Sequence, residues 1–223
     1  MTAGTRFAFP AETLAFLADL RQHNDKPWFD ANRSRYEAGY LEPAKAFVDA
    51  VAPALDAIVP GIIAEPRVLG SIFRINRDTR FSTDKRPYKD HLDLWFWEGD
   101  RKAAVSGLFL RVSPDAVIVG AGAHNLTKDQ LSGYRAAVVH PDAGPELTES
   151  VRRLERAGHE VGGETYRRAP RGAERFLRHS ALFVHADLSA ESATDPQLVP
   201  GLVQHWRTFA ALHRWLVTYV QRD

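Results

Sequence analysis

The residues best suited to chemistry lie in one short stretch, residues 71–91. It contains six Lys or Arg and three Asp, with Phe73, Phe81 and Tyr88 between them. A solvated run of charges needs no aromatic residues, and a core strand would not accept unpaired arginines. Arginine combined with aspartate and aromatic residues is typical of a surface that holds its cations in fixed directions, as the binding of an anion requires. We therefore expect a functional site in this stretch.

We expect these side chains to form a clamp for a phosphate or carboxylate group. An arginine guanidinium presents forked N–H donors that match the oxygens of such anions. In this interpretation Asp78 orients one guanidinium, and Asp78 or His91 is the candidate catalytic residue for proton transfer. The predicted ligand-binding residues of the stretch are Arg74, Asn76, Arg77, Arg80, Lys85, Tyr88 and Lys89.

Three residues outside the stretch could complete this site. Trp28 and Asn32 lie one turn apart on a predicted helix, so they could line one wall of a pocket. Arg171, in the turn-forming sequence Pro170-Arg171-Gly172, could reach the same anion. Core packing is the simpler explanation for each tryptophan taken singly, and Trp206 fits the apolar stripe of a predicted helix.

The same charges allow two further hypotheses. The carboxylates of Asp78, Asp84, Asp90 and Asp93 could pair with the arginines internally, which would make the cluster a structural network or part of a partner-binding module. Alternatively, the stretch and a second arginine-rich segment, residues 151–179, could bind nucleic acid. The leading hypothesis is a small anionic ligand, bound and possibly transformed. The sequence identifies no cofactor, reaction or oligomeric state.

Composition narrows the class of protein. The chain has 223 residues, of which 44% are hydrophobic and 26% are charged, as in an ordinary soluble domain. A net charge of +1 argues against a general polyanion binder. The absence of cysteine excludes disulfides and thiolate metal sites, and the histidine spacings predict no metal site. With no apolar leader and no membrane-length apolar run, we expect a cytoplasmic protein without membrane contact.

The hydrophobic pattern predicts helices first, then strands, then helices again. Pro43 and Pro53 are expected to divide the segment after residue 40 into short helices, and Asp195 is the expected cap of the last helix. This order predicts an α+β fold, with a central mainly antiparallel sheet packed by N-terminal helices and a long C-terminal helix, in one domain over residues 1–223. Helices are predicted over residues 9–23, 26–40, 128–139, 145–157 and 197–220, and strands over residues 68–76, 93–97, 108–112, 117–121 and 180–187.

Glycine spacing gives one weaker signal. The sequence Gly120-Ala121-Gly122 follows a predicted strand, as phosphate-binding loops do, but a third glycine and an immediate helix are missing. Close approach of another group to the backbone, or a bulge, is the better explanation.

Several motifs, in this order along most of the chain, resemble the DUF2461 family. They are Trp28-Phe29 with Asn32 and Tyr36, the run Phe73-Arg74-Ile75-Asn76-Arg77-Asp78-Thr79-Arg80-Phe81, Asp84-Lys85 with Pro87-Tyr88-Lys89, Val119-Gly120 with Gly122, Leu131 with Tyr134-Arg135, and Ala169-Pro170-Arg171-Gly172. The resemblance implies a fold but no reaction, because this is a domain of unknown function.

The chain departs from the family pattern at two places. After the second glycine it has Ala123-His124-Asn125-Leu126, where relatives usually have tryptophan and proline, and it has Arg178-His179-Ser180 where many have a lysine. If these positions shape the ligand pocket, the resemblance implies a variant ligand for this chain.

Overall fold

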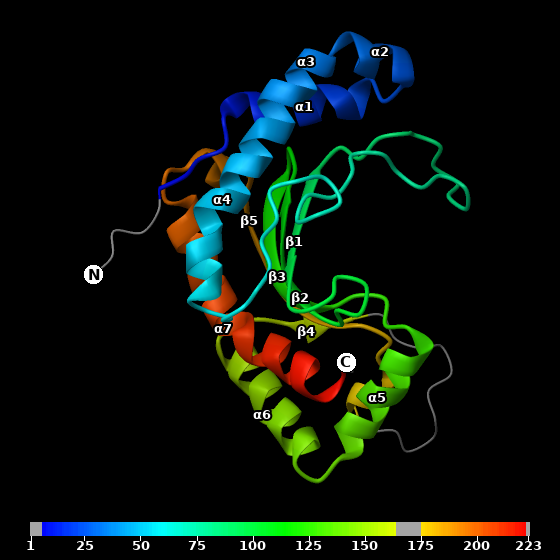
Figure 1. Cartoon of the computed structure of the whole chain (residues 1–223), viewed down its shortest axis with the longest axis vertical. Coiled ribbons are helices and arrows are strands. Elements are labelled where there is room, and N and C mark those ends of the chain that lie inside the picture. Colours follow the sequence, from blue (N-terminus) through cyan, green and yellow to red (C-terminus); the bar gives the residue numbers. More distant parts are fainter. Residues whose placement is uncertain (1–5, 164–174, 222–223) are drawn as a thin grey trace.

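A five-stranded antiparallel sheet forms the centre of the computed structural model, which describes residues 6–163 and 175–221 (Figure 1). Neighbouring strands follow the order β1-β2-β3-β5-β4. The strands are β1 (Leu92–Trp97), β2 (Gly107–Val112), β3 (Ala116–Ala123), β4 (Val161–Gly162) and β5 (Leu182–Ser189). Helices precede and follow the sheet in the sequence, so the predicted α+β class is confirmed.

The β2–β3 hairpin forms as the sequence predicts. Its turn is closed by the amide of Ser113, which donates to the carbonyl of Ala116 at 3.0 Å. The Ser113 hydroxyl oxygen also accepts from the amide of Ala116 at 3.1 Å. Pro114 supplies a fixed φ within this turn, as type I and II turns favour. The hairpin therefore sets the register between β2 and β3.

The first three N-terminal helices lie at one end of the sheet, and the long fourth helix runs alongside it (Figure 1). Asp25 caps α2, because its side chain accepts from the amide of Trp28 at 2.9 Å. The expected division at Pro43 and Pro53 is wrong, since one helix, α4, contains both prolines. Pro43 lies in its first turn, where no N–H is needed, and the buried face of α4 outweighs the cost of Pro53. The helices are α1 (Ala11–Gln22), α2 (Lys26–Ala31), α3 (Arg33–Arg35), the π-helical η1 (Tyr36–Leu41) and α4 (Glu42–Asp56).

The C-terminal half supplies the helix that covers the sheet. The indole of Trp206 in α7 (Leu198–Tyr219) donates to the carbonyl of Gly120 in β3 at 3.2 Å, and Trp206 is fully buried as predicted. The expected cap is wrong: α7 starts after Gln197, and Asp195 instead accepts from the Gln197 amide. The remaining helices are α5 (Lys128–Val139), α6 (Ala143–Arg156), and the 3₁₀ helices η2 (Arg175–Arg178) and η3 (Ala190–Thr194).

Residues 68–76 do not form the predicted strand. Leu69 adopts a φ of 66°, and only isolated bridges connect this segment to its neighbours. The chain instead folds back on itself as a long loop, residues 71–91, which we call the ribbon. Its base is held by the amide of Arg77 donating to Pro87 and the amide of Lys89 donating to Ile75, both at 2.8 Å. The ribbon projects beyond the sheet (Figure 1).

The two faces of the sheet differ. Side chains of one face, including Leu94, Leu110, Val119 and Val184, are buried, and α7 packs against β2, β3 and β5. The register places three rows on the opposite face, which we call the open face. These rows are Asp93-Arg111-Ile118-Asp187, Trp95-Phe109-Gly120-His185 and Trp97-Gly107-Gly122-Phe183.

Glycines let aromatic rings lie flat on the open face. A Cβ at Gly107 would stand 1.9 Å from the indole nitrogen of Trp95, and one at Gly120 would stand 2.2 Å from the Phe109 ring. The close approach expected from the Gly-x-Gly sequence is therefore confirmed at Gly120. No helix in the described part of the chain is both long and apolar enough to cross a membrane.

Replacement of Gly120 by alanine should lower the free energy of unfolding by about 1–3 kcal/mol, because the added methyl group forces Phe109 or the Val184 backbone to move. Urea denaturation measures this change. Gly201→Ala is the matched control: Gly201 lies in α7 with no atom within 4 Å of an added Cβ. Its stability should stay unchanged or rise by up to about 1 kcal/mol. Equal losses in both variants would contradict the packing account.

Candidate functional site

The open face of the sheet carries a cleft of about 610 Å³. The ribbon borders it at one end, where Phe73 contributes to the lining. Aromatic side chains make up much of its wall, and polar groups from β1, β2, β5 and the end of β3 complete it. The aromatic residues are Phe73, Trp95, Phe109 and Phe183, and the polar ones are Asp93, Arg111, His124, Asn125 and His185.

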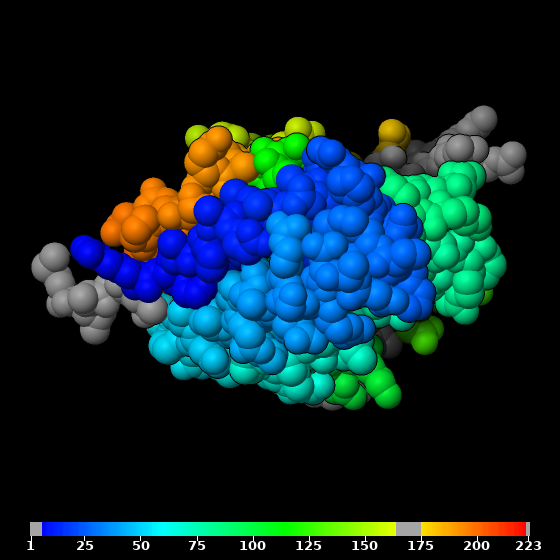
Figure 2. All heavy atoms as spheres, turned by 90° about the horizontal axis from the view of Figure 1, so that it is seen from above, coloured from blue at the N-terminus to red at the C-terminus, as the bar shows by residue number. Residues whose placement is uncertain are grey.

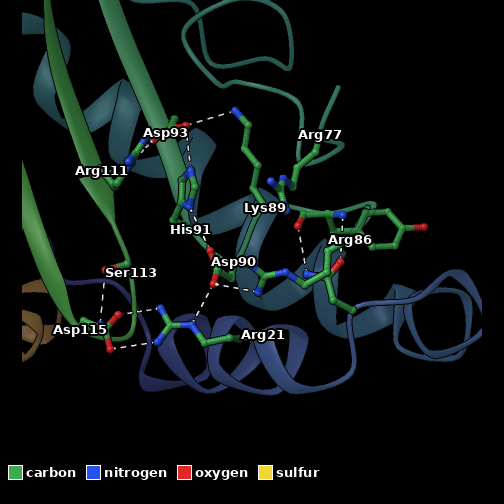
Figure 3. Close-up of polar contacts among 12 residues, drawn as sticks. Arg21, Arg77, Arg86, Lys89, Asp90, His91, Asp93, Arg111, Ser113 and Asp115 are labelled. Carbon is green, nitrogen blue, oxygen red and sulfur yellow. Dashed lines mark hydrogen bonds and ion pairs between the residues drawn. The ribbon is translucent and has the colours of Figure 1, made fainter. Parts of the chain in front are cut away.

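Asp93 gathers the positive groups at the ribbon end of the cleft (Figure 3). Its carboxylate accepts from Arg111 Nε at 2.7 Å and from Lys89 Nζ at 3.1 Å, and lies 3.2 Å from His91 Nε2. Burial alone would raise the pKa of Asp93, but the hydrogen bonds from His91 and Arg111 outweigh it and hold the pKa well below its usual range. Asp93 is therefore a fixed negative charge that positions three side chains.

A chain of polar contacts continues from Asp93 to the β2–β3 turn (Figure 3). His91 Nδ1 lies 3.2 Å from Asp90, and Asp90 accepts from Arg21 Nε at 2.8 Å. Arg21 also pairs with Asp115 of the β2–β3 turn at 2.7 Å. Burial alone would raise the pKa of Asp90, but the bonds from His91 and Arg21 outweigh it and lower the pKa. Helix α1, the ribbon and the sheet are joined by this chain.

Arg101 is the cation whose surroundings are mainly aromatic. Its guanidinium carbon lies 5.3 Å from the ring centroids of Trp95 and Trp97, and 5.6 Å from that of Phe73. Lys89 lies 5.0 Å from the centroid of the same Phe73 ring. Arg101 forms no ion pair with any residue that the structure describes, and its Nε is buried without a hydrogen-bond partner there. Its charge is balanced by ring faces rather than by a carboxylate.

A buried polar triplet holds the loop that carries Arg101. His213 of α7 is hydrogen-bonded through Nδ1 to the Ser106 hydroxyl at 2.9 Å and through Nε2 to Glu98 at 2.8 Å. Ser106 and His213 are both fully buried. Residues 98 and 106 are the two ends of the loop, so helix α7 fixes both of them. This triplet positions Arg101 without itself lining the cleft.

Much of the predicted clamp lies on the ribbon, which forms the blue-green lobe at the right edge of Figure 2. Asp84 pairs with both Arg77 and Arg86, and Asp78 accepts a two-pronged bond from Arg80 at 2.7 and 3.0 Å. The hydrogen bonds from Arg80 lower the pKa of Asp78 to about 2. These cations are thus engaged by the ribbon's own carboxylates, and none of these five residues lines the cleft.

The other ribbon residues are placed differently. Tyr88 is only 7% exposed and stacks on Phe29 at 4.2 Å, and Lys85 donates to the carbonyl of Thr79 at 2.9 Å. Arg74 and Asn76 are exposed. Of the predicted site residues in the described part of the chain, only Lys89 and His91 contact a residue that lines the cleft.

Trp28 and Asn32, predicted outside the ribbon, do not contribute to the cleft wall. Trp28 stacks on His23 at 5.8 Å, and Asn32 donates to the carbonyl of Trp28 at 2.9 Å. Neither lines the cleft. Arg171 lies outside the described residues. No group of three or more potential metal ligands comes together in the ranges that the structure describes.

Sequence reasoning missed the residues that the sheet register brings together. Arg111, Phe109, Phe183 and His185 stand on three rows of the open face, and Arg101 enters from a loop. Two features of the sequence could have indicated these residues. Asp93 and Trp95 alternate along one strand and so share a face, and His124 and Asn125 depart from the family pattern. Both of these latter residues line the cleft.

Residues 12–215 match the protein family described as "Conserved hypothetical protein (DUF2461)". The match covers most of the chain, so the protein belongs to this family, and the resemblance seen in the motifs is confirmed. No curated protein matches the chain. The matched range runs from α1 into α7 and therefore includes both the ribbon and the cleft.

Replacement of Asp93 by asparagine should lower the free energy of unfolding at pH 7 by about 3 kcal/mol, because Lys89 and Arg111 would then face each other without a carboxylate. The pKa of Asp93 is lower in the folded chain than the unfolded value of about 3.9, so its contribution is complete above that value and is lost as the pH falls below it. The variant should therefore lose less stability than the wild type on acidification below about pH 4.

Urea denaturation at several pH values measures both effects. Asp115→Asn, at the exposed outer end of the same chain of charges, is the control and should change stability little. An Asp93 variant as stable as the Asp115 variant at pH 7 would contradict a central role for Asp93.

Proposed function

We propose that the protein binds a small phosphorylated or carboxylated ligand in the cleft on the open face of the sheet. Arg101, Arg111 and Lys89 are the cations that hold the anionic group. The observation that carries this proposal is the charge at the ribbon end of the cleft, where two permanent cations, Lys89 and Arg111, share the carboxylate of Asp93. Arg101 adds a third positive charge over Phe73 and Trp95, two residues that line the cleft. A ligand anion would compensate the excess positive charge.

In this proposal Arg111 and Arg101 each have N–H donors available for the ligand. Arg111 reaches Asp93 through Nε alone among the described residues, so its two terminal NH₂ groups remain for ligand oxygens. Arg101 has no carboxylate partner among these residues, and the rings beneath it fix the plane of its guanidinium. Charge-assisted hydrogen bonds are strongest where aromatic walls exclude water.

Size and shape agree with a small ligand. A volume of about 610 Å³ lies within the range of roughly 300–1,000 Å³ that small-molecule sites occupy. Such sites combine apolar and aromatic walls with a few convergent polar groups. A long nucleic acid would need a basic surface that extends beyond one cleft, whereas most ribbon arginines are paired with aspartates.

The predicted ribbon residues take supporting roles in this proposal. Lys89 contacts the ligand directly, and His91 acts as a positioning residue because both of its ring nitrogens face carboxylates. Asp78 and Arg80 shape the ribbon tip. The proposed anion site therefore lies in the cleft beside the ribbon, and the predicted clamp residues of the ribbon tip are outside it.

Arg101→Met should weaken the binding of phosphorylated probes by about tenfold or more, since it removes a charged donor while keeping an apolar stem on the rings. The probes are ribose 5-phosphate, adenosine 5′-monophosphate and inorganic phosphate at low salt, measured by thermal shift and calorimetry. A probe at about a hundred times its dissociation constant should stabilise the wild type by about 2.7 kcal/mol.

Arg80→Met is the matched control, because Arg80 is an exposed arginine of the ribbon tip that does not line the cleft. Its affinities should equal those of the wild type. Loss of binding in this variant, with Arg101→Met unaffected, would place the anion at the ribbon tip and contradict the proposal. Binding of short DNA with a steep salt dependence, and of no small probe, would support the nucleic-acid hypothesis instead.

A further inference from the structure

The end of the cleft away from Asp93 is built from planar rings. Phe183 of β5 stacks on His124 with ring centroids 4.2 Å apart, and Phe109 of β2 meets His124 edge-on at 5.4 Å. All three residues line the cleft. On β3 the residues paired with Phe109 and Phe183 are Gly120 and Gly122, which carry no side chain, and His124 lies against both rings. This end is a shallow aromatic slot.

Polar groups at the slot offer both donors and acceptors. Asn125 and His185 line the cleft beside the rings. Asn125 adopts a φ of 57°, a left-handed conformation that asparagine tolerates better than most residues. An asparagine amide can donate and accept at once, which suits the edge of a nitrogen-containing ring. A purely hydrocarbon ligand would leave these groups without bonds.

The register sets the distance between the slot and Arg111. Arg111 and Phe109 are two residues apart on β2, and Phe183 lies one further row along the open face. Successive rows are about 7 Å apart. A ring joined to its anionic group through a spacer the size of a sugar would cover this distance, whereas an anion attached directly to a ring would not.

We infer that the ligand is a mononucleotide-like molecule, with a nitrogen-containing planar ring on Phe109 and Phe183 and its phosphate or carboxylate at Arg101 and Arg111. This inference rests on the proposed function and adds the chemistry of the other end of the ligand. Stacking supplies affinity with little dependence on ring identity, and Asn125 selects rings with polar edges.

Binding of adenosine 5′-monophosphate and of ribose 5-phosphate to the whole chain tests the inference, because these probes share the phosphate and differ in the ring. The nucleotide should bind at least about tenfold more tightly. In Phe183→Leu this advantage should shrink to about twofold or less, while the affinity for ribose 5-phosphate stays that of the wild type. The latter affinity also shows that the variant is folded.

A second variant tests the polar edge. Asn125→Gly keeps the left-handed backbone conformation and removes the amide. It should lower the affinity for adenosine 5′-monophosphate severalfold and leave the affinity for ribose 5-phosphate unchanged. A nucleotide affinity that does not change would overturn the role of Asn125.

The outcomes separate the two proposals. If ribose 5-phosphate binds as tightly as adenosine 5′-monophosphate, the anion site stands and the ring slot is wrong. If adenosine binds as well as its monophosphate, the slot stands and the cation site is wrong. If no probe binds the wild type, both are wrong.

Discussion

The side chain of Asp93 lies on the open face of β1 and is only 16% exposed. Its negative charge must therefore be balanced by neighbouring groups of the protein. Hydrogen bonds from Lys89 and His91 of the ribbon and from Arg111 of β2 compensate its charge. Lys89 attaches the ribbon to Asp93, and Arg111 attaches the neighbouring strand. His91 also contacts Asp90, which in turn pairs with Arg21. The position of the ribbon relative to the sheet depends on this one carboxylate, because removing it would leave several cations together.

A second constraint is the unequal covering of the sheet. Helix α7 buries one face, and Trp206 fixes it to the backbone of Gly120. On the other face, Gly107 and Gly120 leave room for the flat rings of Trp95 and Phe109. The cleft therefore lies on the face that α7 leaves uncovered. Its aromatic wall and its charged end stand on different rows of residues along the strands.

Much of the fold could be predicted from the sequence, because its elements carry local signals. The β2–β3 hairpin follows from its turn residues, and the apolar stripe predicts α7 with Trp206 in the core. The prediction failed where tertiary contacts decide. Pro53 does not end α4, since the buried face of the helix outweighs one missing hydrogen bond, and residues 68–76 bend at Leu69 to form the ribbon.

The candidate site could be predicted only in part, because it too depends on tertiary contacts. The density of charge identified the ribbon, and two of its residues, Lys89 and His91, do reach the cleft through Asp93. Periodicity cannot show which arginines pair internally, as Arg77 does with Asp84, and which meet ring faces and no carboxylate among the described residues, as Arg101 does. Nor can it show that Phe109 and Phe183 share a wall, because that depends on the strand order β2-β3-β5.

The most direct test of this account is a crystal structure of the protein with adenosine 5′-monophosphate at saturating concentration. The account predicts the phosphate within hydrogen-bond distance of Arg101 or Arg111 and the base stacked on Phe109 or Phe183. A nucleotide bound at the ribbon tip beside Arg80, with the cleft lacking ligand density, would contradict it.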